Sequence, residues 1–126
     1  MPPTIIVVED DAATRRLYRF LLRNSGYDVI EAEDGIDALE KLAVHDCDVI
    51  ITDMNMPRMG GIEMVRTLRQ NRSQVYVIMV TAFGTPDTEK NALRAGVNEY
   101  LTKPFDFDEL ERRLQNYFAR RNQAES

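Results

Sequence analysis

Acidic side chains stand directly after two apolar runs of the sequence. The run TIIVV is followed by Glu9, Asp10 and Asp11, and the run DVIIT is followed by Asp53. Carboxylates that are brought together repel one another, which raises a pKa or demands a counter-charge. A divalent cation supplies that charge. A small set of hard oxygen ligands favours Mg²⁺, with Mn²⁺ as the alternative, over zinc or a full calcium cage.

Two further apolar runs end in groups that can hold phosphoryl oxygens. VYVIMV is followed by Thr81, and NEYL is followed by Thr102, Lys103 and Pro104. A carboxylate nucleophile at Asp53, a metal beside it, and a hydroxyl and an ammonium for the other oxygens form an arrangement for phosphoryl transfer to aspartate. No glycine-rich phosphate loop accompanies them, so tight nucleotide binding is not indicated.

Each of these residues also has an ordinary structural interpretation. Asp11 is most simply a helix cap, Asp53 can open a turn, Thr81 can be a strand residue, and Lys103 can be solvated. Taken together, these interpretations are weaker, because they leave the repulsion between the carboxylates without a counter-charge.

Composition places the chain among ordinary globular domains. It has 126 residues, of which 44% are hydrophobic and 29% charged, so one domain spanning residues 1–126 is expected. The net charge of -5 disfavours direct binding to nucleic acid. Neither a membrane-length apolar run nor a signal peptide is present, which predicts a cytoplasmic location. Cys47 is the only cysteine of the sequence and His45 the only histidine. We expect Cys47 to lie in the core, and His45 to be solvated or to cap a helix.

The apolar runs predict the elements that position these groups. They are short, rich in β-branched or aromatic residues, and mostly continuous, which is typical of strands buried on both faces. Segments with helical spacing lie between them, for example Leu17 with Leu21. This alternation predicts an α/β layered domain with a parallel sheet, whose ligands bind beyond the carboxyl ends of the strands. The predicted strands are residues 4–8, 28–32, 48–52, 75–80 and 98–101.

Residues that favour helix ends support these boundaries. The polar segment 120–126 is expected to be a frayed tail or the start of a linker. The predicted boundary residues are Asp11 as a cap, Gly26 and Gly96 after helix ends, Pro86 after Thr85, and Asp106 with Glu109 as a capping box.

Four segments resemble, in order and at the right intervals, those of the receiver domain of two-component response regulators, of which the chemotaxis regulator is the familiar example. IIVVEDD resembles its acidic pair, ITDMNMPRMGG its phosphoacceptor strand and loop, VTAF its switch threonine, and YLTKPF its lysine and cis-proline segment. The resemblance covers nearly the whole chain. It implies a flavodoxin-like (βα)5 three-layer sandwich whose five-stranded parallel sheet has the order 2-1-3-4-5, an order that spacing alone does not show.

The resemblance also implies a metal site and a phosphoacceptor. Asp53 becomes the phosphorylated residue and a metal ligand. Glu9 and Asp10 become the metal-binding pair, with Glu9 acting through water, and the backbone carbonyl of Asn55 becomes a further ligand. Asp11 falls one position beyond the pair and is assigned to capping.

The remaining implied roles concern the response to phosphorylation. Thr81 would hydrogen-bond a phosphoryl oxygen, Ala82 would leave room beside it, and Lys103 would form an ion pair with Asp53 or its phosphate. Tyr100 matches the aromatic switch residue, whose ring would turn inward when Thr81 moves. Ordinary strand packing is the other interpretation of Tyr100.

The function implied is phosphorelay signalling. A phosphohistidine on a sensor histidine kinase or a histidine phosphotransfer protein would donate its phosphoryl group to Asp53 with Mg²⁺ bound. The chain would not be a conventional enzyme, but would catalyse its own aspartyl phosphorylation and dephosphorylation. An output partner, which the sequence does not name, would bind the face formed by the fourth helix, fifth strand and fifth helix, and a phosphorylation-dependent dimer is a further option.

Three other classes of protein fit parts of the pattern. An FMN-binding electron carrier shares the architecture but needs a phosphate loop. A haloacid-dehalogenase-like phosphatase needs a second acid where Asn55 stands. The third is a receiver-like interaction module that works without phosphorylation, against which the complete set of acids, Thr81 and Lys103 argues.

Overall fold

Strand and helix alternate along the chain. The structure is a computed structural model that describes residues 2–104 and 106–125. Phe105, in the YLTKPF segment, and Ser126, in the expected tail, lie outside these residues. The elements are β1 (Thr4–Val8), α1 (Ala12–Asn24), β2 (Asp28–Ala32), α2 (Gly35–Val44), β3 (Val49–Thr52), α3 (Gly61–Gln70), β4 (Tyr76–Thr81), α4 (Pro86–Ala95), β5 (Glu99–Thr102) and α5 (Phe107–Glu125).

The five strands form one parallel sheet with the order β2-β1-β3-β4-β5, which confirms the predicted fold class. β1 and β3 lie side by side, with Val8 opposite Thr52. Since both strands run in the same direction, the residues that follow them, Glu9 and Asp53, emerge at the same edge of the sheet.

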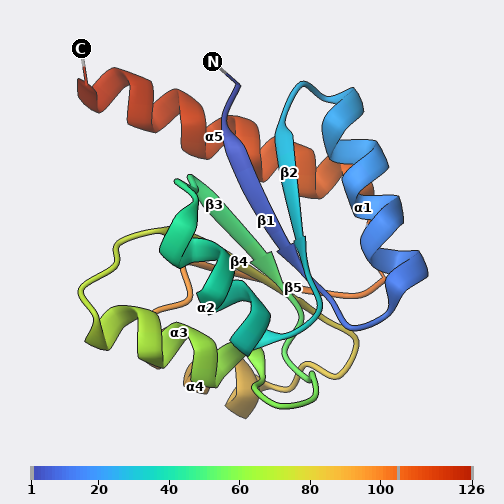
Figure 1. Cartoon of the computed structure of the whole chain (residues 1–126), viewed down its shortest axis with the longest axis vertical. Coiled ribbons are helices and arrows are strands. Elements are labelled where there is room, and N and C mark those ends of the chain that lie inside the picture. The colour runs from blue at the N-terminus through green and yellow to red at the C-terminus, as the bar shows by residue number, and fades with distance from the viewer. Residues whose placement is uncertain (1, 105, 126) are drawn as a thin grey trace.

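Helices cover both faces of the sheet, so its side chains form two separate cores (Figure 1). Along β3, Val49 and Ile51 face α1 and α5, whereas Ile50 faces α2, α3 and α4. All three side chains are buried, because the sheet is covered on both sides. This explains why the strand reads as a continuous apolar run. Helix residues buried in the first core include Leu22, Leu110, Leu114 and Phe118, and those in the second include Ala38, Met64, Val65, Leu68 and Ala92.

Most helix ends are capped as expected. The side chain of Asp11 accepts a hydrogen bond from the Thr14 N–H at 2.9 Å. Pro86 occupies the first turn of α4, after Thr85, which forms a reciprocal capping box with Thr88. Residues at two helix ends take left-handed backbone conformations, Gly26 with φ 97° and Gly96 with φ 113°, as their glycines predicted.

Some predicted details are wrong. β3 begins one residue later than predicted, and β4 and β5 are both shifted by one, so Thr81 is the last residue of β4 rather than the residue after it. Leu17 has the expected helical spacing but is 56% exposed; Leu22 is the buried residue of α1. The expected capping box of Asp106 with Glu109 stays a prediction: the Glu109 N–H donates to the carbonyl of Asp106 at 3.0 Å, and the Glu109 carboxylate pairs with Arg112 and Arg113 on its own helix.

α5 continues to Glu125, so the polar end of the chain is helical up to that residue. Fraying of this end, or its continuation as a linker, stays a prediction. One contact that anchors this end is the ion pair between Arg121 and Asp48, whose nearest atoms are 2.8 Å apart. The sequence gives no local sign of it, since the partners are distant along the chain. Within the described residues, every helix is too short or too polar to cross a bilayer.

The single cysteine and the single histidine lie where the sequence predicts. Cys47 is half-buried against the second core, and burial raises the pKa of its thiol to about 11. His45 is exposed and follows the last residue of α2, and its backbone N–H donates to the carbonyl of Lys41.

Candidate functional site

Backbone hydrogen bonds extend the sheet beyond the ends of β1 and β3. The N–H of Glu9 donates to the carbonyl of Ala32 at 3.0 Å, and the N–H of Asp53 donates to the carbonyl of Val8 at 3.1 Å. The backbones of both acidic residues are therefore held as firmly as those of strand residues. Rigid placement of a nucleophile is what in-line transfer requires.

Three carboxylates converge at this edge. Glu9, Asp10 and Asp53 each offer an oxygen, and these oxygens lie within 4.8 Å of one another. Asp10 is exposed and Asp53 half-buried, whereas Glu9 is only 5% exposed. Burial raises the pKa of Glu9 to about 7; the nearby charge of Asp53 adds to the rise, and the N–H of Asp11 and the charge of Lys103 oppose it.

The donor set fits an oxygen-coordinated divalent cation. Glu9 Oε1 accepts a hydrogen bond from the Asp11 N–H at 3.2 Å, but Oε2 is buried with no hydrogen-bond partner among the described residues. A buried carboxylate oxygen without a partner is costly unless another group satisfies it. The site is open on the side of Asp10, which suits an ion that retains several waters. The position and the chemistry of these carboxylates are thus suited to holding Mg²⁺.

The loop after Asp53 is shaped by close backbone approach. Asp53 Oδ1 accepts a hydrogen bond from the Met54 N–H at 2.7 Å. A Cβ on Gly61 would collide with the carbonyl oxygen of Asp53, and one on Gly60 would lie 2.8 Å from the carbonyl oxygen of Met54. Asn55 lies exposed in this loop; its carbonyl as a metal ligand stays a prediction.

Thr81, the last residue of β4, and Lys103, which follows β5, lie side by side at the same edge of the sheet. The Lys103 N–H donates to the carbonyl of Thr81 at 2.8 Å, and Thr81 Oγ1 accepts a hydrogen bond from the Phe83 N–H at 3.2 Å. The peptide bond between Lys103 and Pro104 is cis, as the YLTKPF segment implied. Within residues 2–104 and 106–125, no ion pair within 4.0 Å joins Lys103 to Asp53. Contact of Lys103 with a phosphoryl group stays a prediction.

Tyr100 contacts the start of α4. Its side chain is half-buried, and its hydroxyl lies 3.1 Å from Oγ1 of Thr88, a member of the α4 capping box. Gly84 makes room for this ring, because a Cβ there would lie 2.8 Å from the Tyr100 hydroxyl. The inward turn expected of a switch residue stays a prediction.

Sequence reasoning missed several residues around the acids. Burial, with the added negative charges of Glu9 and Asp53, raises the pKa of Tyr18 to about 12. Its only signal in the sequence was helical spacing, two turns after Asp11. Charged residues on α1, on β2 and on the loops after β2 and β3 were also missed, because their partners lie far away in the sequence; they are Arg15, Glu31, Asp34 and Arg58.

The sequence is similar to known regulatory proteins. The profile described as response regulator receiver domain matches residues 5–115. Chemotaxis protein CheY1 of Helicobacter pylori is 40% identical over 115 residues, covering 88% of this chain and 93% of CheY1. Transcriptional regulatory protein ZraR of Klebsiella oxytoca is 36% identical over 122 residues, covering 97% of this chain but only 28% of ZraR.

Solved structures agree with these matches. The receiver domain of a Francisella response regulator superposes with a TM-score of 0.88 at 31% identity, covering 94% of this chain and 98% of that one. Chemotaxis protein CheY4 of Vibrio cholerae superposes with a TM-score of 0.86 at 31% identity, covering 92% of this chain and 98% of CheY4.

Proposed function

Because the chain belongs to the response regulator receiver domain family, we propose that it acts in phosphorelay signalling by accepting a phosphoryl group on Asp53. The observation that carries this proposal is the buried, unpartnered oxygen of Glu9 beside Asp10 and Asp53. The donor is a phosphohistidine on a sensor histidine kinase or a histidine phosphotransfer protein.

The step is a displacement at phosphorus. A carboxylate oxygen of Asp53 forms the new O–P bond while the N–P bond of the phosphohistidine breaks, and the bonding electron pair returns to the imidazole nitrogen of the donor. The N–H of Met54, 2.7 Å from Oδ1, orients the attacking carboxylate. When bound, Mg²⁺ supplies positive charge that neutralises phosphoryl oxygens. Glu9, Asp10 and Asp53, with the carbonyl of Asn55, would hold it.

Two other residues of the chain would respond to the new charge. Lys103 has an ammonium that is free of carboxylates within 4.0 Å among the described residues, so it is available to pair with a phosphoryl oxygen. The Thr81 hydroxyl now accepts a hydrogen bond from the Phe83 N–H. It would turn to donate a hydrogen bond to a phosphoryl oxygen. Tyr100 and α4 would then shift, biasing the surface formed by α4, β5 and α5 toward an output partner or a second copy of the chain. We also propose that the protein acts in the cytoplasm, the location predicted from the sequence.

Intact mass after incubation with acetyl phosphate, with and without Mg²⁺, tests the proposal. We expect one Mg²⁺-dependent phosphoryl adduct on the native chain and none on Asp53→Asn. Asp48→Asn is the matched control, because it makes the same change at the opposite end of β3 and should label normally. Equal labelling of Asp53→Asn and the native chain would refute the assignment. If the folded native chain shows no adduct and releases no phosphate, the module that works without phosphorylation is favoured instead.

A further inference from the structure

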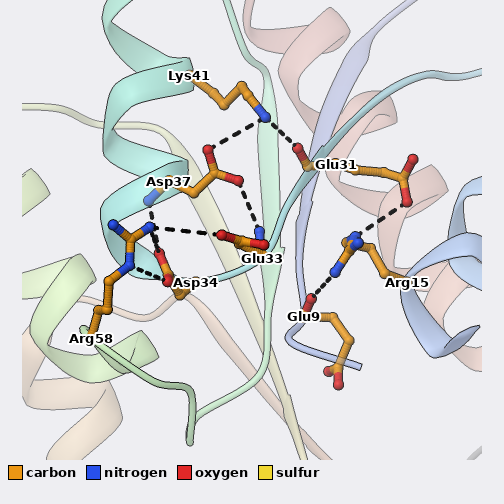
Figure 2. Close-up of polar contacts among 8 residues, drawn as sticks. All are labelled: Glu9, Arg15, Glu31, Glu33, Asp34, Asp37, Lys41 and Arg58. Atoms are coloured by element: carbon orange, nitrogen blue, oxygen red, sulfur yellow. Dashed lines mark hydrogen bonds and ion pairs between the residues drawn. The ribbon is translucent and has the colours of Figure 1, made fainter. Parts of the chain in front are cut away.

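The segment 31–34, which we call the connection, comprises the last two residues of β2 and the two residues that lead to α2. It contacts both halves of the acidic site without supplying a ligand to it (Figure 2). One half is the main chain at Glu9 and Asp10, after β1. The other half is the loop that runs from Asp53 to α3. Each half is joined to the connection by an arginine.

Arg15 of α1 joins the first half. Its Nε lies 3.2 Å from a carboxylate oxygen of Glu31, and its Nη1 donates to the carbonyl of Glu9 at 2.7 Å. Only 17% of the Arg15 side chain is exposed. The peptide that Arg15 holds is the one between Glu9 and Asp10, so the arginine, oriented by Glu31, holds the main chain from which both carboxylates project.

Arg58 joins the second half. Its Nε and Nη2 lie 2.7 and 3.0 Å from the two oxygens of Asp34, a bidentate pair. The Asp34 side chain is only 4% exposed and also accepts a hydrogen bond from the Asp37 N–H at 2.9 Å. Arg58 itself has a left-handed backbone with φ 60°, and the N–H of Gly35 donates to the carbonyl of Met59 at 3.0 Å. The loop after Asp53 is therefore held at its far end.

The connection is itself tied to α2, so it can act as a fixed support (Figure 2). Lys41 Nζ donates to the carbonyl of Glu31 at 2.8 Å and lies 3.5 Å from Asp37. The Asp37 carboxylate in turn accepts a hydrogen bond from the Glu33 N–H at 3.0 Å. Every contact in this set joins a charged side chain to backbone or to an opposite charge.

We propose that Glu31 and Asp34, acting through Arg15 and Arg58, are positioning residues that set the spacing between the two halves of the Mg²⁺ and phosphoacceptor site. This inference rests on the proposed function. Asp53 itself is held by its hydrogen bond to the carbonyl of Val8. Without the Arg58 tie, the loop after Asp53, which carries the predicted carbonyl ligand of Asn55, gains freedom relative to Glu9 and must be ordered when the ion binds, which lowers affinity.

Three isosteric variants test the inference: Glu31→Gln, Asp34→Asn and the control Asp48→Asn. Asp48 performs the same two tasks as Asp34, accepting a backbone N–H, that of Thr4, and pairing with an arginine, Arg121, each at 2.8 Å. It lies at the amino end of β3, away from the acids. Asparagine remains a good helix cap, so Asp34→Asn weakens the Arg58 tie while α2 keeps its cap.

The measurement is Mg²⁺ affinity by titration of backbone amide shifts, with unfolding free energies measured in parallel. We expect Asp34→Asn and Glu31→Gln to weaken Mg²⁺ binding by about tenfold, the lower end for residues that orient metal ligands, and to slow labelling by acetyl phosphate. Asp48→Asn should also lower the free energy of unfolding, by less because the Asp48 side chain is 32% exposed, but should keep the native Mg²⁺ affinity. If Asp34→Asn does not fold, Arg58→Gln makes the same test from the exposed partner.

The outcomes separate this inference from the proposed function. Native Mg²⁺ affinity in both Asp34→Asn and Glu31→Gln, or an equal loss in Asp48→Asn, would overturn the positioning role even if the native chain is labelled. Absence of both labelling and phosphate release on the folded native chain would overturn the proposed function, whereas the comparison of Mg²⁺ affinities would still decide whether the connection positions the ligands.

Discussion

Glu9 is the residue whose environment is least like that of an ordinary surface acid. It is 5% exposed, one of its oxygens has no hydrogen-bond partner among the described residues, and burial raises its pKa to about 7. A carboxylate in such a place costs stability when ionised and no cation is bound. The cost predicts that folding is coupled to protonation of Glu9 and to binding of the proposed cation.

Stability without Mg²⁺ should therefore fall as the pH rises through this residue's titration. The folded-state pKa of Glu9 lies above its ordinary value of 4.5, so the folded chain binds more protons between about pH 4.5 and 7. The raised pKa of Glu9 therefore adds to the free energy of unfolding. This contribution is fully present below pH 4.5 and is lost as the pH rises through about 7. Thermal unfolding at several pH values should show this decline in the native chain relative to Glu9→Gln.

Mg²⁺ should reverse that difference, because the ion binds the deprotonated carboxylate. At saturating Mg²⁺, the native chain should gain stability relative to Glu9→Gln as the pH rises from 5 to 8. An identical pH dependence of the two proteins, with and without the ion, would contradict the assignment of the raised pKa to Glu9.

At the scale of elements, the junction of β3, its loop and α3 depends on a missing side chain. Gly61 begins α3, and a Cβ there would collide with the carbonyl oxygen of Asp53 and lie 2.8 Å from Cε of Met79. The methionine end can move, but the carbonyl belongs to the backbone of Asp53, the proposed phosphoacceptor. Helix packing and the position of Asp53 are thus linked at one residue.

Gly61→Ala should destabilise the protein even though alanine is the better helix former by about 1 kcal/mol. Overpacking of this kind typically costs about 1–3 kcal/mol, and here the backbone has to move. Urea unfolding measures the net change, and the labelling rate with acetyl phosphate should fall as well. A gain in stability equal to the helix propensity would show that the junction relaxes without cost.

At the scale of the whole molecule, the sheet separates two cores, and none of the described side chains belongs to both. Ile51 and Ile78 pair across β3 and β4 and lie in the core under α1 and α5. Ile50 lies in the core under α2, α3 and α4. The backbone of the sheet lies between the two cores.

Double substitutions should report this separation. Ile→Val at each position is expected to cost about 0.5–1.5 kcal/mol. Ile50→Val with Ile78→Val, on opposite faces, should be additive within about 0.5 kcal/mol, whereas Ile51→Val with Ile78→Val, in contact on one face, should depart from additivity by more. Equal coupling in both pairs, measured by urea unfolding, would mean that the two cores do not act independently.

The sequence by itself determined the elements and the edge of the sheet at which the acidic residues meet. Continuous apolar runs end at Glu9 and Asp53, and parallel strands bring their carboxyl ends together, so the acidic cluster followed from the order of residue types. The strand order came from family resemblance, because spacing does not say which strands are neighbours. Boundaries such as that of β4 were one residue off, since burial continues up to Thr81 and only the ladder shows where pairing stops.

Only the tertiary structure decided what surrounds those residues. The pairing of Asp34 with Arg58, and of Arg15 with Glu31 and the Glu9 carbonyl, joins charges that lie on different elements. A charged residue in a sequence looks solvated until its partner is brought to it. The raised pKa of Glu9 likewise depends on burial by neighbours far along the chain, a property that no local pattern contains.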